Sequence, residues 1–138
     1  MKKILVLVLC LGLFGCAMLE IDPAISKYKA VAPKIKLGDS KEDVLSLLVP
    51  TQKSLSGSAS KSPEAYIQDG NTVEIYYFRS GRQPDGITTD DEFTPYIFTN
   101  GKLTGIGWSV LGGAKSHGQV IQPAPVTNIQ QNQSTTVY

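Results

Sequence analysis

The chain has 138 residues, enough for one small domain with a modest hydrophobic core and a tail. Its 13 Lys and Arg side chains nearly balance its 12 Asp and Glu side chains, so the formal net charge is +1. Nucleic-acid-binding domains carry a basic patch or an excess of basic residues, which this composition does not provide. We therefore expect a single domain that binds no nucleic acid.

The first sixteen residues have the pattern of an export signal that ends at a cysteine. Lys2 and Lys3 precede an unbroken apolar run from Ile4 to Phe14, and Gly15-Cys16 follows. The run is shorter than the about 20 apolar residues that a membrane-spanning helix needs. A buried or transmembrane N-terminal helix is the alternative, and the positive start and the Gly-Cys ending favour export. The pattern resembles the lipobox of bacterial lipoproteins.

A lipobox divides the chain into a signal peptide, residues 1–15, and a mature protein that is lipidated on Cys16. Each buried acyl methylene contributes about 0.8 kcal/mol, so several acyl chains hold a protein on a membrane. Because no Asp follows Cys16, the resemblance implies the outer membrane, with the protein on its periplasmic side. Cys10 is lost with the signal peptide, so the mature chain cannot form an internal disulfide.

A short spacer is expected to lead from the anchor into the first predicted helix. Residues 16–32 are expected to hold the lipidated anchor, a spacer and the start of this helix. Asp22 is a suitable N-cap, and Pro23 suits the first helical position, where its missing N–H has no helical partner to lose. Pro33 is expected to stop the helix.

The clearest helix start in the chain is at Ser40. Ser40 as N-cap and Asp43 three residues later match the capping-box pattern. Pro50 is expected to end this helix, and the Ser-, Lys- and Gly-rich stretch from Thr51 to Pro63 predicts a mobile loop. The helix should bury a stripe formed by Val44, Leu47 and Leu48.

The second half of the chain has the composition of an antiparallel sheet. Asp69-Gly70-Asn71 is a turn signal, and strands are predicted at residues 72–79, 94–99 and 102–110, which are rich in β-branched and aromatic residues. Asn100-Gly101 between the last two strands is a strong signal for a two-residue hairpin. This turn predicts the cross-strand pairs Thr99–Lys102, Phe98–Leu103, Ile97–Thr104 and Phe93–Trp108.

Apolar side chains fall on both faces of this sheet, although two short helices can cover only one. The uncovered face is therefore a candidate partner surface. One face of the sheet is expected to carry Tyr96, Phe98 and Leu103, and the other Phe93, Ile97, Ile106, Trp108 and Val110.

From Gly112 to Tyr138 the chain is rich in Gln, Asn, Ser and Pro, which predicts a disordered tail.

Four stretches follow the lipobox in a recognisable order: residues 34–44, 76–79, 84–88 and 97–104. Their order resembles the SmpA/OmlA (BamE-like) family of outer-membrane lipoproteins. The resemblance implies that residues 33–111 form an α+β domain, in which two short helices pack on a three-stranded antiparallel sheet, as in β-lactamase inhibitor proteins. The disordered tail, residues 112–138, would follow. The resemblance also implies envelope proteins, such as barrel-assembly subunits, as partners.

No constellation for catalysis or metal binding is evident, so we expect no enzyme activity, cofactor or metal. The only histidine, His117, lies in the predicted tail with no mature cysteine beside it. The run Asp90-Asp91-Glu92 suits a calcium loop or a carboxylate pair, but a solvated loop is favoured because the spacing of calcium loops is missing. Gly105 and Gly107 favour close approach of a helix or partner over phosphate binding.

The sequence therefore predicts a non-enzymatic binding or scaffold module that acts in outer-membrane protein assembly. It would be held on the membrane by acyl chains such as palmitate. It would act through its sheet face and the loops from Arg79 to Glu92. An inhibitor-like or ligand-binding periplasmic lipoprotein of the same fold is the alternative. No small-molecule substrate is evident.

Overall fold

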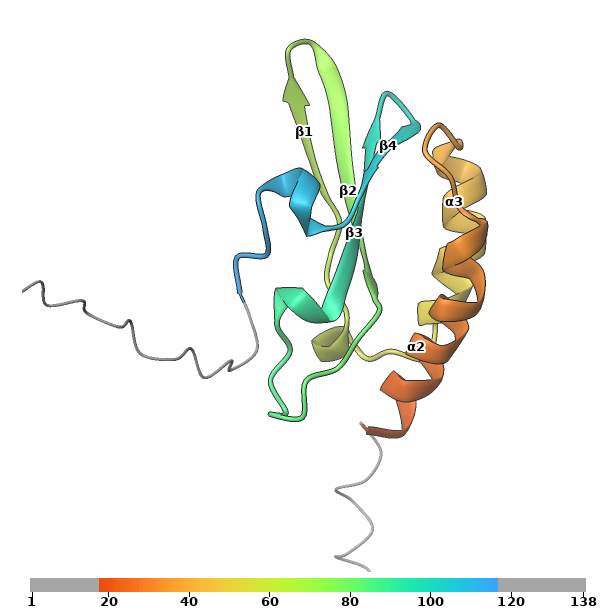
Figure 1. Ribbon diagram of the computed structural model, residues 1–138, viewed down its shortest axis with the longest axis vertical. Helices are drawn as coiled ribbons and strands as arrows, with labels where there is room; N and C mark the ends of the chain where they lie inside the picture. Colours follow the sequence, from red (N-terminus) through yellow and green to blue (C-terminus); the bar gives the residue numbers. More distant parts are fainter. Residues whose placement is uncertain (1–17, 117–138) are drawn as a thin grey trace, which may run out of the picture.

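The computed structural model describes residues 18–116, in which two helices stand against one face of a single sheet (Figure 1). The helices are α2 (Met18–Val31) and α3 (Lys41–Leu48). The antiparallel sheet has the strand order β1 (Glu64–Gln68), β2 (Asn71–Arg79), β3 (Phe93–Thr99), β4 (Lys102–Ile106). The predicted α+β class with two helices is confirmed, whereas the predicted count of three strands is wrong because the sheet has four.

Helix α2 begins earlier than the sequence predicts. Pro23 lies inside the helix, because the helix already starts at Met18. Near this end, the hydroxyl of Ser54 donates to the carbonyl of Glu20 at 3.3 Å, so a second segment packs on the first turns. The helix ends at Val31 and continues as the short 3₁₀ helix η2 (Ala32–Lys34), which confirms the predicted stop at Pro33.

Helix α3 begins at the predicted cap. Ser40 Oγ accepts a hydrogen bond from the Asp43 N–H at 3.1 Å and donates to the Asp43 carboxylate at 2.7 Å. Val44 and Leu48 are buried, but Leu47 is 37% exposed, so the buried stripe is narrower than predicted. The helix ends at Leu48, and the chain continues as the 3₁₀ helix η3 (Val49–Gln52), which contains Pro50.

The segment predicted as a mobile loop, residues 51–63, is largely folded, and it leads into a strand that the sequence did not reveal. It buries Thr51 and Ala59, the latter in η4 (Gly57–Ala59). Strand β1 then pairs with β2 through a turn at Asp69-Gly70, where both φ angles are positive. All five β1 side chains are exposed, so the alternation that marks a half-buried strand is missing from its sequence.

The Asn100-Gly101 hairpin forms as predicted, with φ angles of 48° and 76°. The pairs Thr99–Lys102 and Phe98–Leu103 are both present. A bulge between Ile97 and Phe98 then shifts the register, so Ile97 pairs with Gly105 and the predicted partner, Thr104, is wrong.

The bulge also changes which face the end of β4 presents. Ile106 pairs with Tyr96 and packs with the helix-side core, not on the opposite face as predicted. Strand β4 ends there, so Trp108 is not a strand residue opposite Phe93. The two residues still meet, because Trp108 Nε1 donates to the Phe93 carbonyl at 2.7 Å.

Hydrophobic cores form on both faces of the sheet. Between the helices and the sheet, the hydroxyls of Tyr28 and Tyr96 are 3.0 Å apart, and burial together with this hydrogen bond raises the pKa of Tyr96. The helix-side core consists of Tyr28, Ile35, Val44, Leu48, Phe78, Tyr96, Phe98 and Leu103. The opposite core consists of Val73, Ile75, Tyr77, Phe93 and Ile97, against which Trp108 and Leu111 pack.

The chain after β4 folds back over the face opposite the helices. It turns at Gly107, whose φ is 93°, into η6 (Trp108–Leu111), which lies on this face in Figure 1. A Cβ on Gly105 would lie 2.8 Å from Val110 Cγ1, so only glycine permits this approach. The prediction for Gly105 is confirmed, whereas the predicted uncovered apolar face is wrong because its side chains are buried beneath η6.

Candidate functional site

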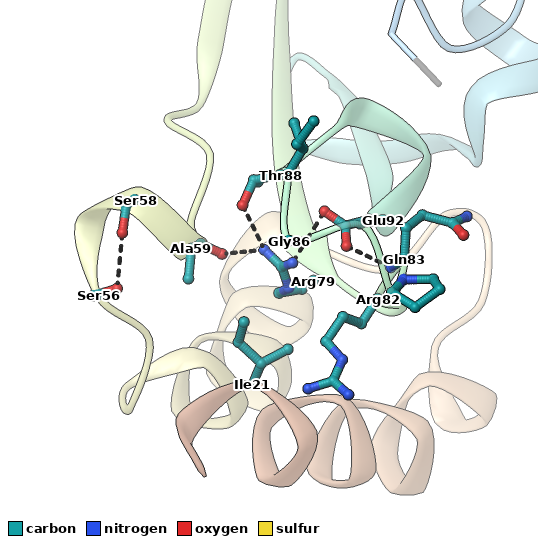
Figure 2. Close-up of a pocket in the computed structure, with 12 residues that line it drawn as sticks. Ile21, Ser56, Ser58, Ala59, Arg79, Arg82, Gln83, Gly86, Thr88 and Glu92 are labelled. Atoms are coloured by element: carbon teal, nitrogen blue, oxygen red, sulfur yellow. Dashed lines mark hydrogen bonds and ion pairs between the residues drawn. The ribbon is translucent and has the colours of Figure 1, made fainter. Parts of the chain in front are cut away.

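The candidate site is built around Arg79, the last residue of β2, which is only 2% exposed. Its Nη1 donates to the carbonyl of Ala59 at 2.9 Å, and its Nη2 lies 3.0 Å from Glu92 Oε2 (Figure 2). The ring of Phe93 lies 5.3 Å from the guanidinium carbon. A charge this deeply buried is tolerated only when it is paired and hydrogen-bonded.

Glu92 is the partner of Arg79 and organises the loop between β2 and β3. Its carboxylate is 1% exposed and accepts hydrogen bonds from the N–H groups of Gln83 at 2.7 Å and Thr89 at 3.0 Å. One buried side chain therefore holds both ends of the segment from Gln83 to Thr89. The end of β2 is fixed from the other side by Gln52, whose Oε1 accepts from the Arg79 N–H at 2.7 Å.

A pocket of about 360 Å³ lies above the Arg79–Glu92 pair. Its walls come from three separate parts of the chain: the first turn of α2, the η4 segment and the loop after β2 (Figure 2). At the rim, Arg82 Nη1 lies 3.6 Å from Asp22 Oδ1, which connects the loop to α2. Besides the ion pair, the lining includes Ile21, Ser56, Ser58, Pro84, Ile87 and Thr88.

The chemistry of this pocket is suited to binding. The Glu92 carboxylate is already engaged by Arg79, and no described histidine or cysteine lines the pocket. Among the described residues, Arg79 Nε is the one buried side-chain polar atom without a hydrogen-bond partner. A buried donor without an acceptor is costly and often accompanies a functional constraint.

A second polar cluster lies beside η6 on the opposite face of the sheet. Lys61 Nζ is 4.5 Å from the centre of the Tyr77 ring and 2.6 Å from Asp90 Oδ1. Tyr77 stacks on Trp108, with ring centres 5.6 Å apart, and burial together with a hydrogen bond to Glu64 raises its pKa. Burial opposes ionisation of Asp90, but the hydrogen bond and charge of Lys61 hold its pKa below the ordinary value.

The structure describes only some of the site residues that the sequence predicts. Cys16, the predicted lipid attachment site, and the tail histidine, His117, lie outside the described residues, as does the tail from residue 117 onward. The predicted solvated acidic loop is wrong for Glu92, which is buried against Arg79. The loop from Arg79 to Glu92 was expected to take part in binding, and its residues form one wall of the pocket above the ion pair.

The Arg79–Glu92 contact was not foreseen, although the sequence contains a signal for it. Arg79 ends an apolar strand, and Glu92 directly precedes Phe93, with which Arg79 pairs across the sheet. Two opposite charges at the same end of neighbouring strands are well placed to meet. Their burial depends on η4 and the loop covering them, which the local pattern does not reveal.

Within residues 18–116, no helix is long and apolar enough to cross a membrane. The same residues contain no group of three or more His, Cys, Asp or Glu side chains placed to hold a metal ion.

The fold and the pocket define a small α+β domain with a cavity at one end of its sheet. The chain belongs to the family described as Protein of unknown function (DUF3192), whose family model matches residues 26–112. The matched part includes α3, all four strands and η6. No curated protein and no solved structure matched the chain significantly.

Proposed function

We propose that this protein is a lipid-anchored, non-enzymatic binding module that faces the periplasm from the outer membrane. The observation that carries the proposal is the sequence Lys2-Lys3, apolar run, Gly15-Cys16 placed directly before a folded domain. Helix α2 begins at Met18, so only Ala17 separates the proposed lipidated cysteine from the first helical residue. The domain is therefore tethered closely to the membrane surface.

The short tether supports a membrane-proximal position for the pocket. Ile21, which lines the pocket, lies five residues after Cys16. Two extended steps and one helical turn span at most about 12 Å, so Ile21 lies within that distance of the anchor. A partner that binds at the pocket would be one that also lies at or in the membrane.

We propose that the partners are envelope proteins, such as subunits of the barrel assembly machinery. The resemblance of residues 34–44, 76–79, 84–88 and 97–104 to the SmpA/OmlA (BamE-like) family supports this partner class. The loop from Arg79 to Glu92 is the proposed contact region, because its buried ion pair keeps the pocket walls in a fixed shape. A preformed surface loses little entropy when it binds.

The pocket volume favours a second candidate, a ligand-binding or inhibitor-like periplasmic lipoprotein of the same fold. Sites for small ligands have volumes of about 300–1,000 Å³, with mainly apolar walls and a few fixed polar groups. The pocket of about 360 Å³ meets that description through Ile21, Ile87 and Arg79.

Labelling with a radioactive fatty acid, followed by membrane fractionation, tests the anchor. We expect the wild-type protein to carry label in the outer-membrane fraction and the Cys16→Ser variant to carry none. Cys10→Ser is the matched control and should retain the label, because Cys10 lies within the removed signal peptide. Wild-type protein without label, found in the cytoplasm or the inner membrane, would contradict the anchor.

Affinity capture separates the two candidate functions. The scaffold proposal expects the anchored wild-type protein to recover barrel-assembly subunits from detergent-solubilised membranes, and recovery of none would exclude that partner class. The alternative expects the Cys16→Ser variant to retain a tight partner or ligand in solution. Ile87→Asp, which places a charge on an apolar part of the pocket lining at a position that is 54% exposed, should weaken either contact.

A further inference from the structure

Strand β1 presents an outer edge that no described part of the chain covers. It is the terminal strand of the sheet, and no backbone hydrogen bond from another described segment reaches it. Its side chains include the exposed Tyr66 and Ile67, the latter 69% exposed. Proteins usually protect such edges, because unpaired N–H and C=O groups attract another strand.

The register identifies the unpaired backbone groups. Gln68 and Asn71 flank the two-residue turn as a hydrogen-bonded pair, and bonded pairs alternate along antiparallel strands. Tyr66 is therefore bonded to β2 through its backbone. The N–H and C=O groups of Ala65 and Ile67 point outward from the sheet.

The described chain ends close to this edge. Ser116 Oγ accepts from the Asp90 N–H at 2.8 Å, and its carbonyl accepts from the Asp91 N–H at 3.3 Å. Just before it, Gly113 and Lys115 line one groove together with Glu64 and Tyr66 of β1. Residues 117–138 follow, and β1 needs only five partner residues, which span about 17 Å.

We propose that residues 120–126 of this chain, Val-Ile-Gln-Pro-Ala-Pro-Val, pair with the outer edge of β1 as a fifth strand. The segment starts four residues after Ser116, within about 14 Å of it, and reaches the Glu64 end of β1 first. A direct path along the strand makes the pairing parallel. The proposal is independent of the lipid anchor, and the segment lies outside the family match at residues 26–112.

The two prolines suit this position. In a strand, successive N–H groups point to opposite edges, so Pro123 and Pro125 share one edge and Gln122 and Ala124 the other. With Gln122 and Ala124 facing β1, the missing N–H groups of both prolines face outward. The prolines then close the new edge to further pairing, which is the position that proline takes in sheets.

The two prolines also lower the entropic cost of the proposed pairing. A residue before proline is held in the β or polyproline region, which applies to Gln122 and Ala124. An extended segment loses less conformational entropy on pairing than a flexible one. Both proline-preceded residues therefore favour the proposed pairing with the edge that the described residues leave uncovered.

Residue-specific amide hydrogen exchange tests this pairing, with the full chain compared to a variant that ends at Ser116. We expect the Ala65 and Ile67 amides to exchange about tenfold or more slowly in the full chain, because each then donates a hydrogen bond. The Tyr66 amide, already bonded to β2, should change far less. Equal rates in the two chains at Ala65 and Ile67 would overturn the proposal.

Two single proline substitutions test which N–H groups of the segment face β1. Ala124→Pro removes an N–H that faces β1 and should abolish the protection of Ala65 and Ile67. Ile121→Pro removes one that faces outward and should leave that protection in place. Equal effects of the two substitutions would overturn the proposed pairing, and so would protection that rises with protein concentration, since a second copy would then be the occupant.

Discussion

The two edge strands of the sheet are held in different ways. Residues 38–41 lie along the outer edge of β4, where the Gly38 N–H donates to the Leu103 carbonyl at 2.8 Å and the Leu103 N–H donates to the Asp39 carbonyl at 2.9 Å. No described backbone group bonds to the outer edge of β1. The turn before α3 thus closes one edge, and the other stays open within residues 18–116.

The side chains follow the same division. Leu103 of β4 is 1% exposed in the helix-side core, whereas Ile67 of β1 is 69% exposed. Polar side chains hold β1 and the segment before it: the Tyr77 hydroxyl donates to Glu64 at 2.9 Å, and Lys61 pairs with Asp90. Apolar packing therefore secures β4, and hydrogen bonds and charges secure β1.

Among the polar contacts, loss of the Arg79–Glu92 pair should lower stability most, so Glu92→Gln is expected to have the largest effect. The substitution leaves the buried Arg79 guanidinium without its counter-charge, and breaking one partner of a buried ion pair costs about 3–5 kcal/mol. Urea unfolding should show this loss in the free energy of unfolding. The segment that leads into β1 should also become sensitive to protease, because Arg79 holds the Ala59 carbonyl.

A matched control is Glu74→Gln, which removes the partner of Lys41. That ion pair is 2.9 Å long, close to the 3.0 Å of the Arg79–Glu92 pair, but its side chains are 25% and 21% exposed. Pairs exposed to water contribute about 0–1 kcal/mol, so this variant should lose little stability. Equal losses for Glu92→Gln and Glu74→Gln would contradict the structural importance of the buried pair.

The next effect tests the apolar side of the comparison. Leu103→Ala opens a cavity in the helix-side core and should lower the free energy of unfolding by about 2–5 kcal/mol. Ile67→Ala removes a similar side chain from the exposed strand and should change stability by no more than about 0.5 kcal/mol in the chain that ends at Ser116. A loss for Ile67→Ala as large as that for Leu103→Ala would show that β1 is buried in solution.

The smallest effect is the pH dependence of the Lys61–Asp90 pair. The folded-state pKa of Asp90 lies below its ordinary value of 3.8, so the ionised group stabilises the fold above that value. This contribution is lost as the pH falls through the folded-state pKa. The stability difference between wild type and Asp90→Asn should therefore be constant near neutral pH and shrink in the acid range.

Urea unfolding of both proteins over a series of pH values measures this difference. In a Lys61→Met background, only the backbone hydrogen bonds of Ser116 and Lys115 oppose the effect of burial on Asp90, so the decrease toward acid pH should become much smaller or reverse. A difference that stays constant down to pH values well below 3.8 would contradict the inferred pKa direction.

Local patterns in the sequence predicted much of the fold and only part of the site. The Ser40 cap and the Asn100-Gly101 turn were predictable because each depends on a few adjacent residues. Strand β1 was missed, because an exposed strand has no alternation of buried and exposed side chains. The bulge at Ile97 was missed because a bulge depends on the packing of two strands and not on the turn.

By itself, the sequence determined the class of the fold, the cap of α3 and the hairpin. Those features arise from backbone preferences and periodicity within short stretches. Only the tertiary structure decided that Arg79 and Glu92 are buried together, that η6 covers the second face of the sheet, and that residues 38–41 close the edge of β4 while no described residue closes the edge of β1. Burial and edge closure depend on segments distant in sequence, so no local pattern specifies them.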